Sequence, residues 1–150
     1  MKRFIIVGAA LALCGLNIAI AQSDVLSSTA VMREQGNIVY RSMNGMVKGE
    51  APYDKAKAEE LFAQLAATTV RIPAAFPESN KGKTSEKSRY SASPKLWETP
   101  DQFKAAIATM AKAIADNRSK TTTLEEFKGA VTAVNNACNA CHDTFRVRVN

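Results

Sequence analysis

Apolar residues recur every three or four positions along four separate segments of the chain. This spacing places them on one face of an α-helix, so the pattern predicts four amphipathic helices. The segments cover about 24–48, 54–72, 94–117 and 123–145, and the third begins between positions 94 and 100. No segment alternates apolar and polar residues over a useful strand length, and no internal repeat is evident.

Residues that typically start and stop helices lie at the ends of these segments. Gly49 follows the first segment, and Pro73 ends the second. Residues 99–102 and 123–126 match capping boxes for the third and fourth helices, the former with proline at the first helical position. Residues 73–93 are rich in Lys, Ser, Gly and Pro, so we interpret them as a surface loop.

Four amphipathic helices with mostly short links predict an all-α protein, an antiparallel four-helix bundle with up-down-up-down topology. The predicted core face of the first helix consists of Val25, Thr29, Met32, Gly36, Val39, Met43 and Met46. That of the fourth helix consists of Leu124, Phe127, Val131, Val134, Cys138, Cys141 and Phe145.

The fourth segment contains the motif Cys-x-x-Cys-His at residues 138–142, the attachment signature of haem c. Each thiol can form a thioether to the porphyrin edge, and the histidine supplies an imidazole for the iron. Cys138, Cys141 and His142 share one helical face, so they can reach one flat ligand. His142 is also the only histidine in the chain. We predict one covalent haem c, with His142 as proximal ligand, inside the bundle near the end of the fourth helix.

Other readings of the two cysteines fit less well. A zinc site needs four ligands, and the only further cysteine is Cys14, in a segment that is expected to be removed. A thioredoxin-type pair needs a βαβ context and a helix N-terminus, whereas this pair falls late in a helical segment. A disulfide across two residues of a helix has poor geometry.

The N-terminal segment matches a secretory signal. Lys2 and Arg3 precede an apolar run, and Ala19-Ile20-Ala21 is a cleavage site of the A-x-A type. We predict that residues 1–21 are a cleaved signal peptide and that residues 22–150 form one periplasmic domain without a membrane span. A retained membrane anchor is the alternative, but the apolar run is short and interrupted.

The charge of the chain is moderately positive. The formal net charge is +6, and loss of Lys2 and Arg3 with the signal peptide lowers it to +4. A modest excess spread along the chain favours steering toward an acidic redox partner over nucleic-acid binding, although it is also compatible with an ordinary solvated surface. No apolar outer stripe decides between a monomer and a homodimer.

The sixth position of the iron is left open by these residues. With no second histidine, it can hold Met, Lys or water, or be empty. In an antiparallel bundle the end of the fourth helix lies beside the start of the first, which places Met32 level with His142. Of the candidate methionines, at positions 32, 43, 46 and 110, only Met32 is then at the right level, since Met43 lies roughly 16 Å further along the axis. Gly36, one turn after Met32, leaves room for a macrocycle, but Met32 as simple core filler is the alternative.

Taken in order, these features resemble class II cytochromes c, the cytochrome c' superfamily, over essentially all of residues 22–150. The resemblance rests on the haem motif, on Phe145-Arg146 after it, and on the segments 48–54 and 93–97. It implies a four-helix bundle around haem c. Arg146 matches a basic residue common in the family, which either acts electrostatically on the haem or stabilises the helix C-terminus.

The superfamily has a high-spin branch that binds nitric oxide or carbon monoxide on an open distal face. Its low-spin branch uses a methionine from the first helix as sixth ligand and transfers electrons. Residues 32–36 resemble the low-spin pattern and imply Met32 as the distal ligand. Many members carry an arginine one turn before the distal residue, where this chain has Ser28.

The sequence therefore predicts a periplasmic electron carrier with a His142/Met32-ligated haem c. The alternative is a five-coordinate haem protein that captures nitric oxide or carbon monoxide beside Met32. A peroxidase-like enzyme would need a polar acid/base group on the distal face, where the first helix offers apolar residues, so enzymatic activity is not expected.

Overall fold

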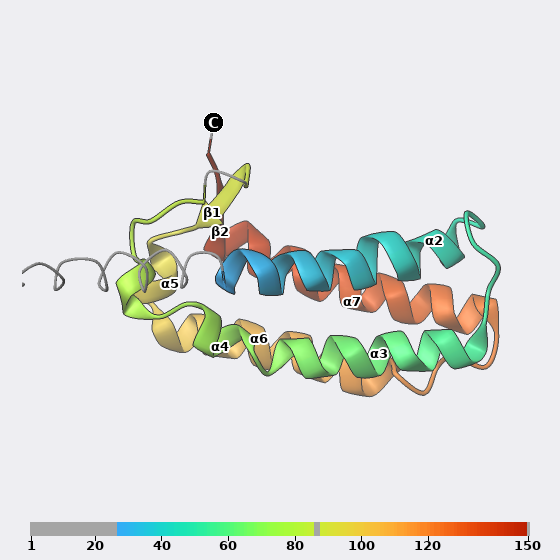
Figure 1. The fold of residues 1–150 in the computed structure, drawn as a ribbon. Coiled ribbons are helices and arrows are strands. Elements are labelled where there is room, and N and C mark those ends of the chain that lie inside the picture. Colours follow the sequence, from blue (N-terminus) through green and yellow to red (C-terminus); the bar gives the residue numbers. More distant parts are fainter. Residues whose placement is uncertain (1–26, 86–87, 150) are drawn as a thin grey trace, which may run out of the picture.

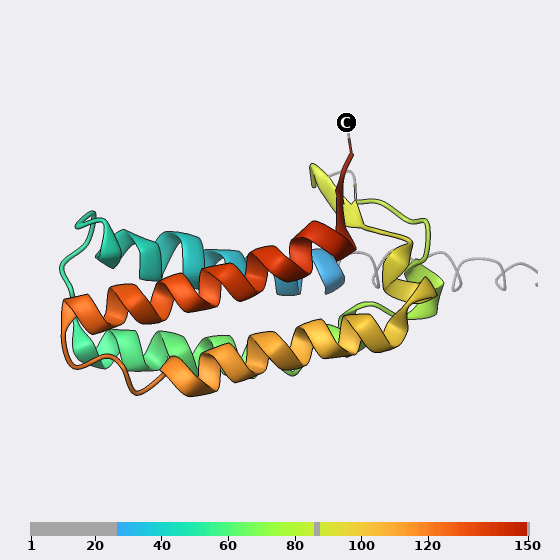
Figure 2. The same cartoon turned by 180° about the vertical axis from the view of Figure 1, so that it is seen from behind.

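The computed structural model describes residues 27–85 and 88–149, which form a bundle of four long helices lying side by side (Figures 1 and 2). Helix one covers residues 27–47, and the other three are α3 (Lys55–Thr69), α6 (Pro100–Asn117) and α7 (Leu124–Phe145). Successive helices alternate in direction, which confirms the predicted antiparallel four-helix bundle. The predicted signal peptide, residues 1–21, lies outside the described residues.

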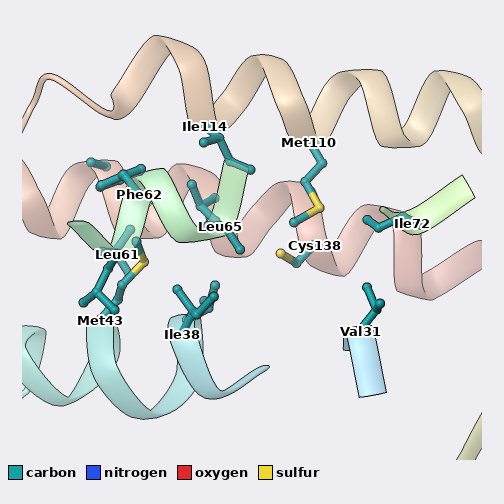
Figure 3. Close-up of a cluster of buried hydrophobic side chains, with 14 of the residues drawn as sticks. Val31, Ile38, Met43, Leu61, Phe62, Leu65, Ile72, Met110, Ile114 and Cys138 are labelled. Atoms are coloured by element: carbon teal, nitrogen blue, oxygen red, sulfur yellow. The ribbon is translucent and has the colours of Figure 1, made fainter. Parts of the chain in front are cut away.

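The bundle interior is mostly apolar, and all four helices contribute to it (Figure 3). Its largest fully buried apolar side chains are Val39, Met43, Phe62, Leu65, Ile114, Phe127, Val131 and Val134. At one end Phe127 stacks against Phe62 and Tyr53, with ring centroids 6.3 and 5.5 Å away. Within the described residues, no helix is both long and apolar enough to cross a bilayer.

Local hydrogen bonds explain where two of the helices begin. Asp54 caps α3 by accepting from the backbone N–H of Lys57 at 2.8 Å. Thr123 and Glu126 form the predicted capping box of α7. The predicted capping box at Thr99 is wrong, although α6 does begin at Pro100: the Thr99 hydroxyl instead donates to the carbonyl of Lys95, because Thr99 also ends the preceding short helix.

Helix one is not a uniform α-helix. Residues 27–36 are α-helical, then the chain continues through the π-helix η1 (Asn37–Met43) into α2 (Asn44–Val47). The wider π turn shifts the side chains around the axis, so Ile38 and Val39 are both buried. The buried face before this turn is Val31 and Gln35, not the predicted Met32 and Gly36. The predicted core face of helix one is therefore correct for Val39, Met43 and Met46, which are buried, but not for Met32 and Gly36, which are only partly buried.

The segment between α3 and α6 is more structured than the predicted surface loop. It contains α4 (Ile72–Ala75), η2 (Glu78–Asn80), β1 (Tyr90–Ala92) and α5 (Lys95–Glu98). Pro73 lies in the first turn of α4, where a missing N–H is tolerated, and does not end the preceding helix. Five described residues of this segment are buried: Ile72, Ala75, Asn80, Ser93 and Leu96.

A short β-pair joins this segment to the chain after α7. Strand β2 (Arg146–Arg148) pairs antiparallel with β1 in the register Tyr90↔Arg148, Ser91↔Val147 and Ala92↔Arg146. The guanidinium of Arg146 lies 4.4 Å from the centroid of the Tyr90 ring. The pair therefore fixes residues from two distant parts of the sequence beside the end of α7 (Figure 1).

Candidate haem site

The last turns of α7 place the two cysteines and the histidine of the motif on one side of the helix. Cys138 is buried, and Cys141 and His142 are half-buried; both thiols are free. All three line a cavity of about 410 Å³. This volume is within the range of small-molecule sites, about 300–1,000 Å³. The motif thus opens on a preformed space between the helices.

Helix one supplies the opposite wall of this cavity. Met32, Gly36 and Val39 line it, so Met32 and the motif residues share one space. A Cβ atom at Gly36 would meet only the Tyr40 ring, at an ordinary 3.9 Å. No protein atom therefore requires glycine at position 36, and a larger side chain there would project into the cavity.

Met110 also lines the cavity, from α6, and is 4% exposed. In Figure 3 its side chain extends from α6 toward Cys138 of α7. Met43 and Met46 are buried in helix one and do not line the cavity. The expectation that Met32 alone lies at the level of the motif was therefore too narrow, because it compared methionines along helix one and left α6 out.

The rest of the interior wall is apolar and aromatic. The Phe103 ring packs edge-on against Phe145 and Phe76, with ring centroids 5.2 and 5.8 Å apart. Ile72 and Leu96 complete this wall. Such a surface excludes water from a bound group and favours a flat hydrophobic ligand such as a porphyrin.

Burial controls the protonation of the motif. It raises the pKa of the Cys138 thiol to about 11, with a further contribution from Cys141, and it also raises the pKa of Cys141. Both thiols are therefore protonated at neutral pH, unlike the thiolates of redox-active pairs. Burial, helped by Arg146 and opposed by Asp143, lowers the pKa of His142 to about 4. The imidazole is therefore neutral, as metal ligation requires.

Two side chains at the cavity carry buried polar atoms without a partner among the described residues. These atoms are Nδ1 of His142 and both amide atoms of Asn80. An unmet buried polar group costs about 1–3 kcal/mol, so native structures rarely leave one. The described residues contain no His/Cys/Asp/Glu cluster that could hold a bare metal ion. A ligand that combines an iron, an apolar ring and polar groups matches the histidine, the apolar wall and the unpaired Asn80 amide of this cavity.

The cations around the cavity were only partly foreseen. Arg33, Lys83, Arg89 and Arg146 line it, and none of the described lining residues is Asp or Glu. Arg146 was singled out in the sequence, and its effect on the pKa of His142 places it close to that imidazole. Lys83, Arg89 and Asn80 were missed, because the segment that carries them has the composition of a solvent-exposed loop.

A four-helix bundle with a Cys-x-x-Cys-His motif facing an apolar cavity from the last helix is typical of a bundle-type c-type cytochrome. The chain belongs to the cytochrome c' family, whose profile, described as Cytochrome C', matches residues 27–146. This chain is accordingly a c-type electron-transfer cytochrome, and haem c is its cofactor.

The relatives of this chain include proteins named cytochrome c-555 or c-556 and proteins named cytochrome c'. A cytochrome c-555 of Bradyrhizobium diazoefficiens is 35% identical and covers 99% of each chain. A cytochrome c-556 of Rhodopseudomonas palustris is 33% identical over 97% of each. The structure of oxidised cytochrome c556 from that organism aligns with a TM-score of 0.75 at 32% identity, over 86% of this chain and 99% of that one. Its cytochrome c' aligns with a TM-score of 0.74 at 27% identity, over 85% and 98%.

Proposed function

We propose that this protein is a periplasmic electron carrier whose haem is attached through Cys138 and Cys141 and ligated by His142 and Met32. One observation supports the proposal: these four side chains line one cavity, although Met32 belongs to the first helix and the other three belong to the last. When bound, the haem supplies a one-electron couple.

The residues of the chain would tune that couple in three ways. The neutral imidazole of His142 offers a lone pair without competition from a proton at neutral pH. The thioether of Met32 is a soft ligand, and Met/His ligation raises the reduction potential. The apolar wall formed by Phe103, Phe145 and Ile72 excludes water and keeps the dielectric low.

Export is part of the proposal and depends on residues 1–21. The basic start, the apolar run and the A-x-A site together support a cleaved signal peptide. N-terminal sequencing of the exported protein should find Gln22 as its first residue; an uncleaved N-terminus would contradict this part of the proposal.

Replacement of the two methionines at the cavity tests the ligation. We expect the ferric wild-type protein to be low-spin at neutral pH and Met32→Ala to be high-spin. Met110→Ala should stay low-spin, because the proposal makes Met32 and not Met110 the sixth ligand. Absorption and EPR spectra distinguish these states. A high-spin wild-type protein, or a low-spin Met32→Ala variant, would exclude Met32 as the sixth ligand.

The second candidate function is capture of nitric oxide or carbon monoxide by a five-coordinate haem. Two observations favour it: Met32 is only half-buried, and Gly36 leaves space beside it. In addition, a cytochrome c' of Rhodopseudomonas palustris is 30% identical over 99% of each chain. Rapid binding of carbon monoxide to the ferrous wild-type protein would support this function, and slow binding that becomes rapid in Met32→Ala would support the carrier.

A further inference from the structure

Asn80 is a buried amide that the proposed attachment and axial ligands do not use. It ends the short helix η2, is 4% exposed and lines the cavity. Neither Nδ2 nor Oδ1 has a hydrogen-bond partner among the described residues. A buried primary amide normally makes several hydrogen bonds, so this side chain is placed for a ligand.

The backbone around Asn80 is firmly held. Its N–H donates to the carbonyl of Pro77 at 2.9 Å, and its carbonyl accepts from the N–H of Lys83 at 3.0 Å. The same Pro77 carbonyl accepts from the indole N–H of Trp97 at 3.1 Å, which ties η2 to α5. Asn80 therefore lies in a turn that is held by its own backbone hydrogen bonds and by the bond from Trp97 to Pro77.

The surroundings of Asn80 indicate the charge of its partner. Lys83 and Arg89 lie on the same segment and line the cavity, as do Arg33 of helix one and Arg146 of β2. No carboxylate of the described residues lines it. An amide N–H among cations suits an anionic oxygen acceptor, and the only anionic groups of haem c are its two propionates.

We propose that the Asn80 side-chain N–H donates a hydrogen bond to a haem propionate, which makes Asn80 a positioning residue for the haem. The inference rests on attachment of the haem at Cys138 and Cys141. The bond withdraws negative charge from the propionate, so it disfavours the ferric state and raises the reduction potential. The turn at residues 77–83 then supplies a polar contact to the haem that the apolar helices do not.

The direct test uses the wild-type holoprotein in its ferrous, diamagnetic state. We expect nuclear Overhauser contacts between the Asn80 side-chain amide protons and the methylene protons of a propionate. If the ferrous iron proves five-coordinate, its carbon monoxide adduct gives the diamagnetic spectrum, so failure of Met32 ligation does not affect the test. Absence of these contacts, or contacts to the Met32 methyl group instead, would overturn the proposal.

Variants provide a second readout, the midpoint potential. Asn80→Leu should lower it, whereas Asn136→Leu, an exposed amide of α7 that does not line the cavity, should leave it unchanged. Asn80→Asp should lower it more than Thr84→Asp, which adds the same charge at an exposed site of the same segment. Equal potentials within either pair would contradict the proposed bond. Where a variant fails to fold, the wild-type spectrum decides.

Discussion

Gly36 shows how a single residue can leave space for a cofactor. It lies one turn after Met32 on the cavity side of helix one, and an added Cβ would make one ordinary contact with Tyr40. Glycine inside a helix costs about 1 kcal/mol relative to alanine. Since neighbouring protein atoms do not demand glycine, the volume needed by the haem is the physical reason that the structure offers.

Gly36→Leu should therefore reduce the haem content or abolish the low-spin spectrum, because the new side chain occupies the haem volume. Gly129→Leu is the matched control, since Gly129 is an exposed helical glycine of α7 with open space around it. Haem per protein and the absorption spectrum are the measurements. A Gly36→Leu protein indistinguishable from Gly129→Leu would show that position 36 does not border the haem.

At the scale of elements, helix one has two functional faces. Gln35 lies at the boundary between them: its amide donates to Thr69 Oγ1 of α3 at 3.2 Å, and it also lines the cavity, as Met32 and Gly36 do. The π-helix η1 then brings Val39 and Met43 into the core. An extra residue per turn is a common device at functional sites because it redirects side chains without breaking the helix.

This division explains what the sequence could predict. Three-four spacing found all four helices, and the motif located the cavity side of α7, because both signals are local. The sequence did not predict the π-helix η1, because the apolar residues in and around it are still spaced by three and four positions, as in an α-helix. Three-residue strands such as β1 lack a readable alternation, and the burial of Asn80 depends on α5 and Trp97, contacts that no local pattern encodes.

The capping box of α7 should contribute measurably to the stability of the element that carries the haem motif. Thr123→Ala removes the hydroxyl that accepts from the Glu126 N–H, and we expect a loss of about 1 kcal/mol in the free energy of unfolding. Thr122→Ala is the control, because Thr122 uses its backbone N–H toward Glu126 and keeps it in the variant. Denaturant unfolding of the holoprotein measures both; equal losses would refute a specific role of the cap.

At the scale of the whole molecule, the charge around the cavity is one-sided. Its described lining includes Arg33, Lys83, Arg89 and Arg146 and no acid, although the complete chain carries 14 Asp and Glu residues. A local positive field of this kind accelerates encounters with negatively charged molecules at low ionic strength. This supports the proposal of an acidic redox partner that approaches at the cavity side.

Small inorganic oxidants test that field without a known partner. Oxidation of the ferrous protein by the anion ferricyanide should slow as sodium chloride rises, because salt screens the attraction. Oxidation by the cation tris(phenanthroline)cobalt(III) should become faster under the same titration. Stopped-flow absorbance measures both rates. The same salt dependence for both oxidants would mean that the positive field does not reach the site of electron transfer.

The position of the motif on α7 has a consequence for biogenesis. Helix one, α3 and α6 all precede it, so the attachment cysteines are translated only after the other three helices. A chain that stops before α7 can never acquire the pigment. Red colour in a preparation therefore shows that synthesis of each coloured chain continued through the motif of α7, which makes haem absorbance a check against C-terminal truncation.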